Sequence, residues 1–69
     1  MRLSTRNQLT GTVTAITEGS VNASVTVAVG DQVVTSSITL EGLLELGLAE
    51  GSPVTVLVKA SDVMLAVED

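Results

Sequence analysis

Apolar and polar residues alternate over much of the chain, a period-two pattern that is typical of half-buried β-strands. In residues 8–17, Leu9, Val13 and Ala15 share one face of the expected strand and threonines occupy the other. In residues 21–29, valine and alanine alternate with short polar side chains. The pattern predicts two strands that are joined through a Glu-Gly-Ser turn into a long hairpin.

The pattern then continues into a third strand and a helix. Residues 32–38 follow a Gly-Asp turn and are rich in β-branched side chains, which favour a strand that pairs back on the second. Thr39 is suited to cap a helix over residues 40–46, and Gly47 is placed to end it. We expect one short helix after three strands.

The last third of the chain predicts two more strands. After a Glu-Gly-Ser-Pro break, residues 54–59 alternate again, and residues 64–67 offer a short fifth strand. Five strands with a helix between the third and the fourth follow the order of an OB-like Greek-key barrel. We therefore predict an all-β fold in which residues 1–69 form a single domain.

The composition suggests that one chain cannot complete its core. The chain has 69 residues, of which 45% are hydrophobic and none is aromatic, and it contains no cysteine. A domain of this size buries only about 60% of the surface that its unfolded chain exposes, and disulfides cannot compensate here. We expect the protein to form an obligate oligomer whose interfaces extend the core.

The charge balance excludes one class of function and directs attention to the few cations. The net charge is −5, with three basic residues against eight acidic ones. A generally basic surface for nucleic acid is therefore excluded. The sequence shows neither a long apolar span nor a signal peptide, so we expect a cytoplasmic protein without a membrane partner.

The sequence lacks the residues that most enzymes need. It contains no histidine, cysteine or tyrosine, and no serine or threonine lies in a recognisable nucleophile motif. Glu41 and Glu45 lie on one helix face, where such a pair is far more often solvated than catalytic or metal-binding. We expect a binding protein, not an enzyme.

Two polar clusters could hold an anion. The segment before the first strand gathers hydroxyl, guanidinium and amide donors at Ser4, Thr5 and Arg6 and the two residues that follow, and the fourth strand ends at Lys59. A deprotonated tetrahedral oxyanion only accepts hydrogen bonds, so its site needs such donors and excludes carboxylates. Lys59 could equally be an ordinary exposed lysine.

The start of the expected helix is a third source of donors. The Thr39 hydroxyl lies there together with free N–H groups around Gly42, and helix N-termini commonly bind anions. Thr39 could instead serve only to cap its own helix. The two roles stay open at this point.

Several separate segments of the sequence resemble those of the molbindin (Mop domain) family. Ser-Thr-Arg-Asn-Gln-Leu-Thr-Gly at residues 4–11 is similar to the opening Ser-Ala-Arg-Asn-Gln-hydrophobic-x-Gly of that family. The similarity continues through residues 19–23, the Ile-Thr and Leu-Gly-rich helix, and Lys59-Ala60-Ser61-Asp62-Val63. Thr5 departs from the alanine that is common there, and the added hydroxyl should not abolish a site.

The resemblance implies a hexamer, a trimer of dimers, that binds molybdate, and commonly tungstate, between subunits. In that arrangement one subunit would contribute Ser4, Thr5, Arg6, Lys59 and Ala60, and Thr39 and Gly42 of a partner would complete the pocket. A second type of site, near the threefold axis, would use mainly backbone donors, for which the weaker candidates are Gly19, Ser20, Val21 and Asn22.

The expected role is therefore intracellular molybdenum storage, buffering or delivery. One alternative is an OB-type module for a protein partner, since stacking aromatics for nucleic acid are absent. Another is a regulatory sensor, because similar domains occur fused to molybdate-responsive regulators; here sensing would need a partner protein.

Overall fold

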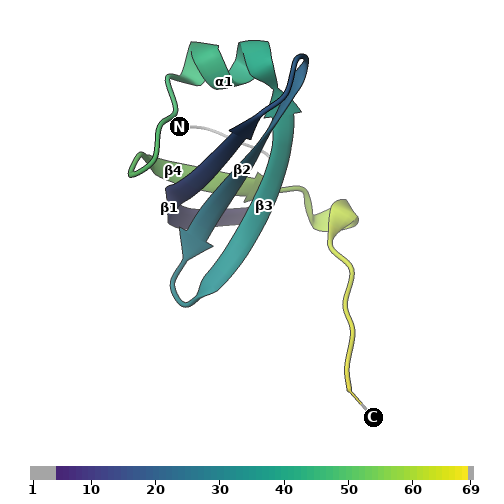
Figure 1. Ribbon diagram of the computed structural model, residues 1–69. Coiled ribbons are helices and arrows are strands. Elements are labelled where there is room, and N and C mark those ends of the chain that lie inside the picture. Colours follow the sequence, from purple (N-terminus) through teal and green to yellow (C-terminus); the bar gives the residue numbers. More distant parts are fainter. Residues whose placement is uncertain (1–4, 69) are drawn as a thin grey trace.

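The computed structural model describes residues 5–68, which form a small β-structure with one helix across its end (Figure 1). The elements in this span are β1 (Asn7–Glu18), β2 (Asn22–Val29), β3 (Gln32–Thr39), α1 (Leu40–Leu46), β4 (Pro53–Val58) and the 3-10 helix η1 (Ala60–Asp62). The first three predicted strands, the helix and the fourth strand are confirmed in that order. No described helix is long and apolar enough to cross a membrane.

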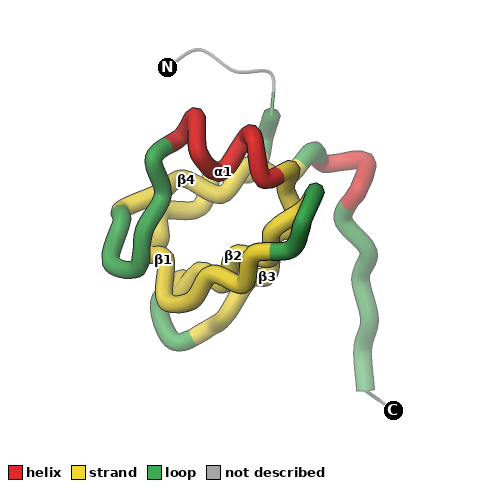
Figure 2. Tube along the Cα trace, turned by 45° about the horizontal axis from the view of Figure 1, so that its top comes forward, coloured by secondary structure: helices red, strands yellow, loops and turns green. Residues whose placement is uncertain are grey.

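The strands form one antiparallel sheet in the order β3-β2-β1-β4. From the other edge this is the order 4-1-2-3 of a Greek key. The long β1 pairs with β4 through residues 7–12 and with β2 through residues 12–18. Figure 2 shows the strands curving round a common centre. The sheet is nevertheless open, because β3 and β4 are its two edges.

The predicted fifth strand is wrong for the single chain. Residues 64–67 form no strand, and the side chains of Met64, Leu65 and Val67 are 93%, 92% and 90% exposed. After η1 the segment leads away from the barrel (Figure 1). The apolar pattern was identified correctly, but the segment has no strand of its own chain beside it.

A β-bulge in β1 changes which side chains point inward, so the predicted alternation does not hold along the whole strand. The register with β2 passes from Val13 opposite Val27 directly to Ala15 opposite Thr26, so that Thr14 is the extra residue. Val13 is buried, as expected, but Ala15 is exposed and Ile16 takes the inward, half-buried position. The simple alternation of Leu9, Val13 and Ala15 was therefore wrong, since one extra residue moves every later side chain to the opposite face.

The core is apolar and small. Its fully buried side chains among residues 5–68 are 1–3% exposed: Val13, Ala23, Val25, Val27 and Leu43. Leu43 is the only buried residue of α1 and anchors the helix to the sheet. Val21, which was expected to begin the second strand, precedes β2 and is 68% exposed.

Candidate oxyanion site

The register of β1 and β4 brings two of the chain's three cations to the same end of the sheet. The last printed pair of this antiparallel ladder is Asn7 opposite Val58. Arg6 directly precedes Asn7 and Lys59 directly follows Val58, so the two residues flank the last pair of the ladder. Both side chains are exposed. This end of the sheet therefore combines a guanidinium and an ammonium group that face solvent.

The other predicted members of this cluster lie along the same two segments. Thr5 is half-buried, and its carbonyl oxygen accepts a 3.2 Å hydrogen bond from the Gln8 side chain, which shapes the entry into β1. Ala60 is exposed and begins η1. Ser4 lies outside the described residues. One carboxylate, Asp62, belongs to the same turn, where its N–H donates to the Lys59 carbonyl at 2.9 Å.

The predicted cap at the start of α1 is confirmed in detail. The Thr39 Oγ1 accepts the Gly42 N–H at 3.0 Å, while Gly47 ends the helix in the left-handed conformation at φ 64°. Thr39 thus does perform the capping role that the sequence left open. A hydroxyl has one donor as well as its acceptor lone pairs. The Thr39 O–H proton therefore remains available to another acceptor, whereas the Gly42 N–H is already used.

Gly42 keeps the space around that hydroxyl open. A Cβ built on Gly42 would lie 3.1 Å from the Thr39 Oγ1, which is closer than side-chain atoms normally approach. The Leu40 N–H is also occupied, because it donates to the Val21 carbonyl at 2.7 Å. Two of the first-turn N–H groups are thus used within the chain, and α1 has an acidic residue, Glu41, in the same turn.

The weaker candidate segment lies next to the helix start. Asn22 is opposite Thr39 in the β2–β3 ladder, and Gly19 donates its N–H to the Asn22 carbonyl at 2.8 Å. Together with the Val21 bond to Leu40, this places residues 19–22 beside Thr39 in one chain. Gly19, Ser20, Val21 and Asn22 are all exposed. The sequence alone gave no sign of this proximity.

The two groups of predicted residues lie at opposite ends of β1. Arg6 and Lys59 lie where β1 begins, while Asn22 and Thr39 lie beyond the other end, because Glu18 pairs with Ala23. Twelve residues separate these ends along the strand, a contour of about 40 Å. None of the side-chain hydrogen bonds among residues 5–68 joins the two groups.

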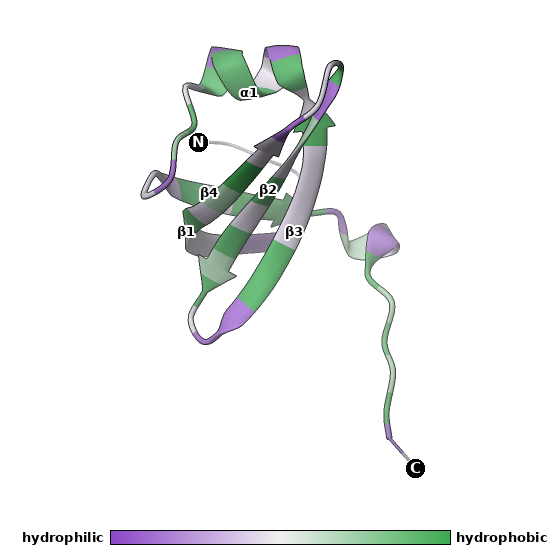
Figure 3. Ribbon diagram, viewed as in Figure 1, coloured by the Kyte–Doolittle hydropathy of each residue, from purple (hydrophilic) through white to green (hydrophobic). Residues whose placement is uncertain are grey.

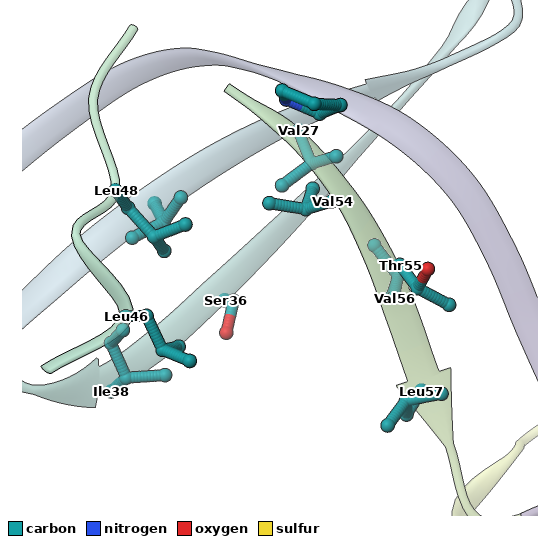
Figure 4. A pocket seen from close by; sticks show the side chains of 11 residues that line it. Val27, Ser36, Ile38, Leu46, Leu48, Val54, Thr55, Val56 and Leu57 are labelled. Atoms are coloured by element: carbon teal, nitrogen blue, oxygen red, sulfur yellow. The ribbon is translucent and has the colours of Figure 1, made fainter. Parts of the chain in front are cut away.

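A pocket among the described residues is of a different chemical kind. It measures about 490 Å³ and opens between the edge strands β3 and β4 (Figure 4). Its lining is apolar except for two hydroxyls and contains no charged side chain: Val25, Val27, Ser36, Ile38, Leu46, Leu48, Pro53, Val54, Thr55, Val56 and Leu57. It includes none of the predicted oxyanion residues, and sequence reasoning did not anticipate it.

The acidic side chains of the described residues do not gather into a cluster. No group of three or more acidic, histidine or cysteine side chains within residues 5–68 is placed to hold a metal ion. The candidate donors at the start of β1 and the end of β4 include two cations, which suit an anion.

Comparison with known families identifies the chain. The TOBE domain family model matches residues 3–65. The chain belongs to this family. Within it, the chain is a member of the molbindin, or Mop, group, as its relatives along almost the full length show. Molybdenum-pterin-binding protein 3 of Clostridium pasteurianum is 42% identical over 66 residues, which are 94% of this chain and 97% of that protein.

Other relatives agree in length and in structure. A probable molybdenum-pterin-binding protein of Haemophilus influenzae is 42% identical over 99% of this chain and 100% of its own. A molybdate-binding protein from Sporomusa ovata has the same fold, with a TM-score of 0.93 at 33% identity over 97% of this molbindin and 100% of that chain. The cytoplasmic molybdate-binding protein ModG, solved with molybdate bound, aligns at a TM-score of 0.93 and 48% identity, with 99% of this chain and 49% of the ModG chain covered. These structures confirm the OB-like, all-β class of the fold.

Proposed function

We propose that this molbindin binds molybdate, and tungstate as a second ligand, at interfaces between copies of itself. The role would be the storage, buffering or delivery of molybdenum inside the cell, without any bond being made or broken. The observation that carries the proposal is the convergence of Arg6 and Lys59 at one end of the β1–β4 ladder in a chain of net charge −5. The relatives named for molybdenum or molybdate support the choice of anion.

The donors suit a tetrahedral dianion. Molybdate can only accept hydrogen bonds, and a guanidinium can offer it two parallel N–H groups while an ammonium supplies a point charge. Arg6 and Lys59 would provide these groups, with the Thr5 and Ser4 hydroxyls and the Ala60 N–H as further donors. Since both cations are exposed in the single chain, the site needs a second surface to exclude water.

A second copy would provide that surface. Because Thr39 and Gly42 lie beyond the far end of β1, they are proposed to come from the partner that closes the pocket. The Thr39 hydroxyl would donate its proton to the anion while its oxygen still accepts the Gly42 N–H. Gly42 would serve as the residue without a side chain that leaves room beside this hydroxyl.

The assembly that follows is a homohexamer built as a trimer of dimers. Burial between copies lowers the local dielectric and strengthens each charge-assisted hydrogen bond. Gly19, Ser20, Val21 and Asn22 are proposed as the donors of a second type of oxyanion site. Their position beside the helix start makes the two types of site neighbours.

Replacing Arg6 by alanine tests the proposal. A charge-assisted hydrogen bond contributes about 1.5–3 kcal/mol, so the Kd for molybdate should rise roughly 10- to 150-fold. Isothermal titration measures the Kd, and far-UV circular dichroism should show an unchanged fold because Arg6 is exposed. Arg6→Lys should lose less affinity than Arg6→Ala, since it keeps the charge but not the paired N–H groups.

A matched control distinguishes the loss of a direct ligand from the effect of a more negative net charge. Gln32→Glu makes the same change in net charge, from −5 to −6, but lies at the exposed start of β3 beside the Gly30-Asp31 turn. It should leave the Kd close to that of the unmodified chain. Equal losses in Arg6→Ala and Gln32→Glu, or no loss in either variant, would contradict a role for Arg6 as a direct ligand.

A further inference from the structure

The chain enters β1 through a bend that a side chain closes. Arg6 lies in this bend, with Thr5 before it and Asn7, the first residue of the strand, after it. The Gln8 side-chain amide donates to the Thr5 carbonyl oxygen at 3.2 Å, so the bond spans the bend. A β-turn is ordinarily closed by the backbone N–H of the residue three positions after the carbonyl. Here the side chain of the residue at that position makes the bond.

Gln8 is itself attached to the sheet. Its backbone belongs to β1, where it lies opposite Leu57 of β4 in the antiparallel ladder. Side chains of directly opposite residues lie on the same face of a sheet, with Cβ atoms about 4.5–5.5 Å apart. The apolar stem of Gln8 therefore has Leu57 as its neighbour across the ladder. The amide that closes the bend thus extends from a paired strand, and it ties Thr5 to that strand.

The bend carries the cation on which the proposed site depends most. Arg6 is exposed, and none of the side-chain hydrogen bonds within residues 5–68 includes it. Lys59, the other cation of this end, directly follows β4, and Figure 3 shows hydrophilic colour where β4 passes into η1. With no contact to hold its guanidinium, the position of Arg6 is set by its backbone.

We infer that Gln8 is a positioning residue of the oxyanion site. Its amide holds the backbone of Arg6 in the place from which the guanidinium reaches the anion. A bend that is already ordered does not have to be ordered when the ligand binds, and affinity gains from that saving. Gln8 does not contact the anion in this arrangement. The inference rests on the proposed function for its ligand, whereas the closed bend is a property of the chain without ligand.

Replacing Gln8 by methionine tests the inference. The variant keeps the length and the apolar stem of the side chain but removes the N–H donor. The loss of one neutral hydrogen bond predicts that the Kd for molybdate rises by about 2- to 10-fold. Isothermal titration measures the Kd, and far-UV circular dichroism should be unchanged because Gln8 is exposed. If Gln8→Met does not fold, Gln8→Asn replaces it, since its shorter side chain withdraws the amide from Thr5.

The chain's other glutamine provides the matched control. Gln32 is also exposed and begins β3, and its amide contacts only the neighbouring Asp31 carboxylate, at 3.5 Å. Gln32→Met should leave the Kd unchanged. Equal values of Kd in Gln8→Met and Gln32→Met would overturn the inference.

A double variant distinguishes positioning of Arg6 from a separate contribution to binding. If Gln8 acts through Arg6, Gln8→Met should cause no further loss of affinity in a chain that already carries Arg6→Ala. A loss of the same size in both backgrounds would overturn the inference. It would show that Gln8 binds the anion itself or supports the site by another route.

Backbone dynamics test the same bond in the absence of any anion. In molybdate-free buffer, ¹⁵N relaxation gives the order parameter of the Arg6 backbone N–H, which should fall from about 0.85, typical of rigid backbone, toward about 0.6 in Gln8→Met. Gln32→Met should not change it. An Arg6 order parameter that is the same in Gln8→Met and in the unmodified chain would overturn the inference. An unmodified chain that binds no molybdate would instead overturn the proposed function, and the order parameter would still decide whether Gln8 holds Arg6 in place.

Discussion

Gly11 is the residue whose lack of a side chain matters most to the barrel. It lies in the half of β1 that pairs with β4, opposite Val54. A Cβ at this position would lie 2.6 Å from the Ala28 carbonyl oxygen and 2.6 Å from a Val27 methyl carbon. One of these is backbone, which cannot rotate away. The close approach of β1 to β2 at this point therefore depends on glycine.

Gly11→Ala should consequently destabilise the protein by about 1–3 kcal/mol, the range of overpacking in a well-packed interior. Urea unfolding followed by far-UV circular dichroism measures the change. Thr12→Ala is the matched control, because Thr12 is the next residue in β1 and is exposed. A Gly11→Ala chain as stable as the Thr12→Ala chain would show that β1 and β2 can separate at no cost.

The sequence predicted the conformation of a residue where it depends on neighbours in the chain. It failed where the conformation depends on residues that are distant in the chain. The Thr39 cap and the Gly47 terminus follow from chemistry within one turn of helix, and both are confirmed. The facing of Ala15 and Ile16 depends on a bulge at Thr14, which arises from pairing with β2 and from bonds of Val13 to Gly51 and Ser52. No pattern within β1 itself reveals that extra residue.

At the scale of elements, α1 links the stability of the fold to the proposed site through Thr39. Aspartate is as good an N-cap as threonine, and its charge suits a helix N-terminus. Thr39→Asp should therefore keep the free energy of unfolding within about 0.5 kcal/mol of the original. The same carboxylate should repel molybdate, so the Kd should rise by roughly tenfold or more.

Thr39→Ala should affect both the stability of the helix and the affinity for molybdate. It removes the cap, which should cost about 1 kcal/mol in denaturant unfolding, and it removes the donor to the anion. Thermal or urea unfolding gives the first effect, and titration with molybdate gives the second. If Thr39→Asp bound molybdate with unchanged affinity, Thr39 would have to be taken out of the site and left with its capping role alone.

The helices and strands show what can and cannot be predicted from one sequence. Alternation and turn residues were sufficient to predict β1 to β4 and their Greek-key order, because those strands find their partners within the chain. Residues 64–67 are also apolar but lie outside any strand. The pattern shows which segments can form strands; it does not show whether a neighbouring strand is available to pair with them.

The molecule as a whole has a small core for its length. Five described side chains are buried, and large apolar side chains remain exposed on α1 and in residues 63–67. Association would remove these surfaces from water. We therefore predict that the thermal midpoint of unfolding rises with protein concentration, because mass action stabilises an assembly relative to unfolded chains.

Far-UV circular dichroism melts over a wide range of protein concentration measure this effect; detection by aromatic absorbance is ruled out because the chain contains no aromatic residue. A midpoint that did not change with concentration in the full chain would argue that one copy is stable by itself.

The site itself stays a prediction, and only the positions of its candidate residues can be compared with the structure. The scarcity of cations singled out Arg6 and Lys59, and the β1–β4 register places them together. Their distance from Thr39 and Gly42 along β1 could not be read from the sequence, nor could the proximity of residues 19–22 to the helix start. A site shared between copies, as proposed here, would have no signature in the order of residues along one chain.

Titration of the assembled protein with molybdate tests the central claim most directly. The sample is first characterised by light scattering with refractive-index detection, and molybdate, sulfate and phosphate are titrated in parallel by calorimetry. Three or four charge-assisted hydrogen bonds predict saturable molybdate binding with a Kd of about micromolar on an oligomer, with sulfate and phosphate much weaker. A monomer that gives no heat with any of the three anions would contradict the account.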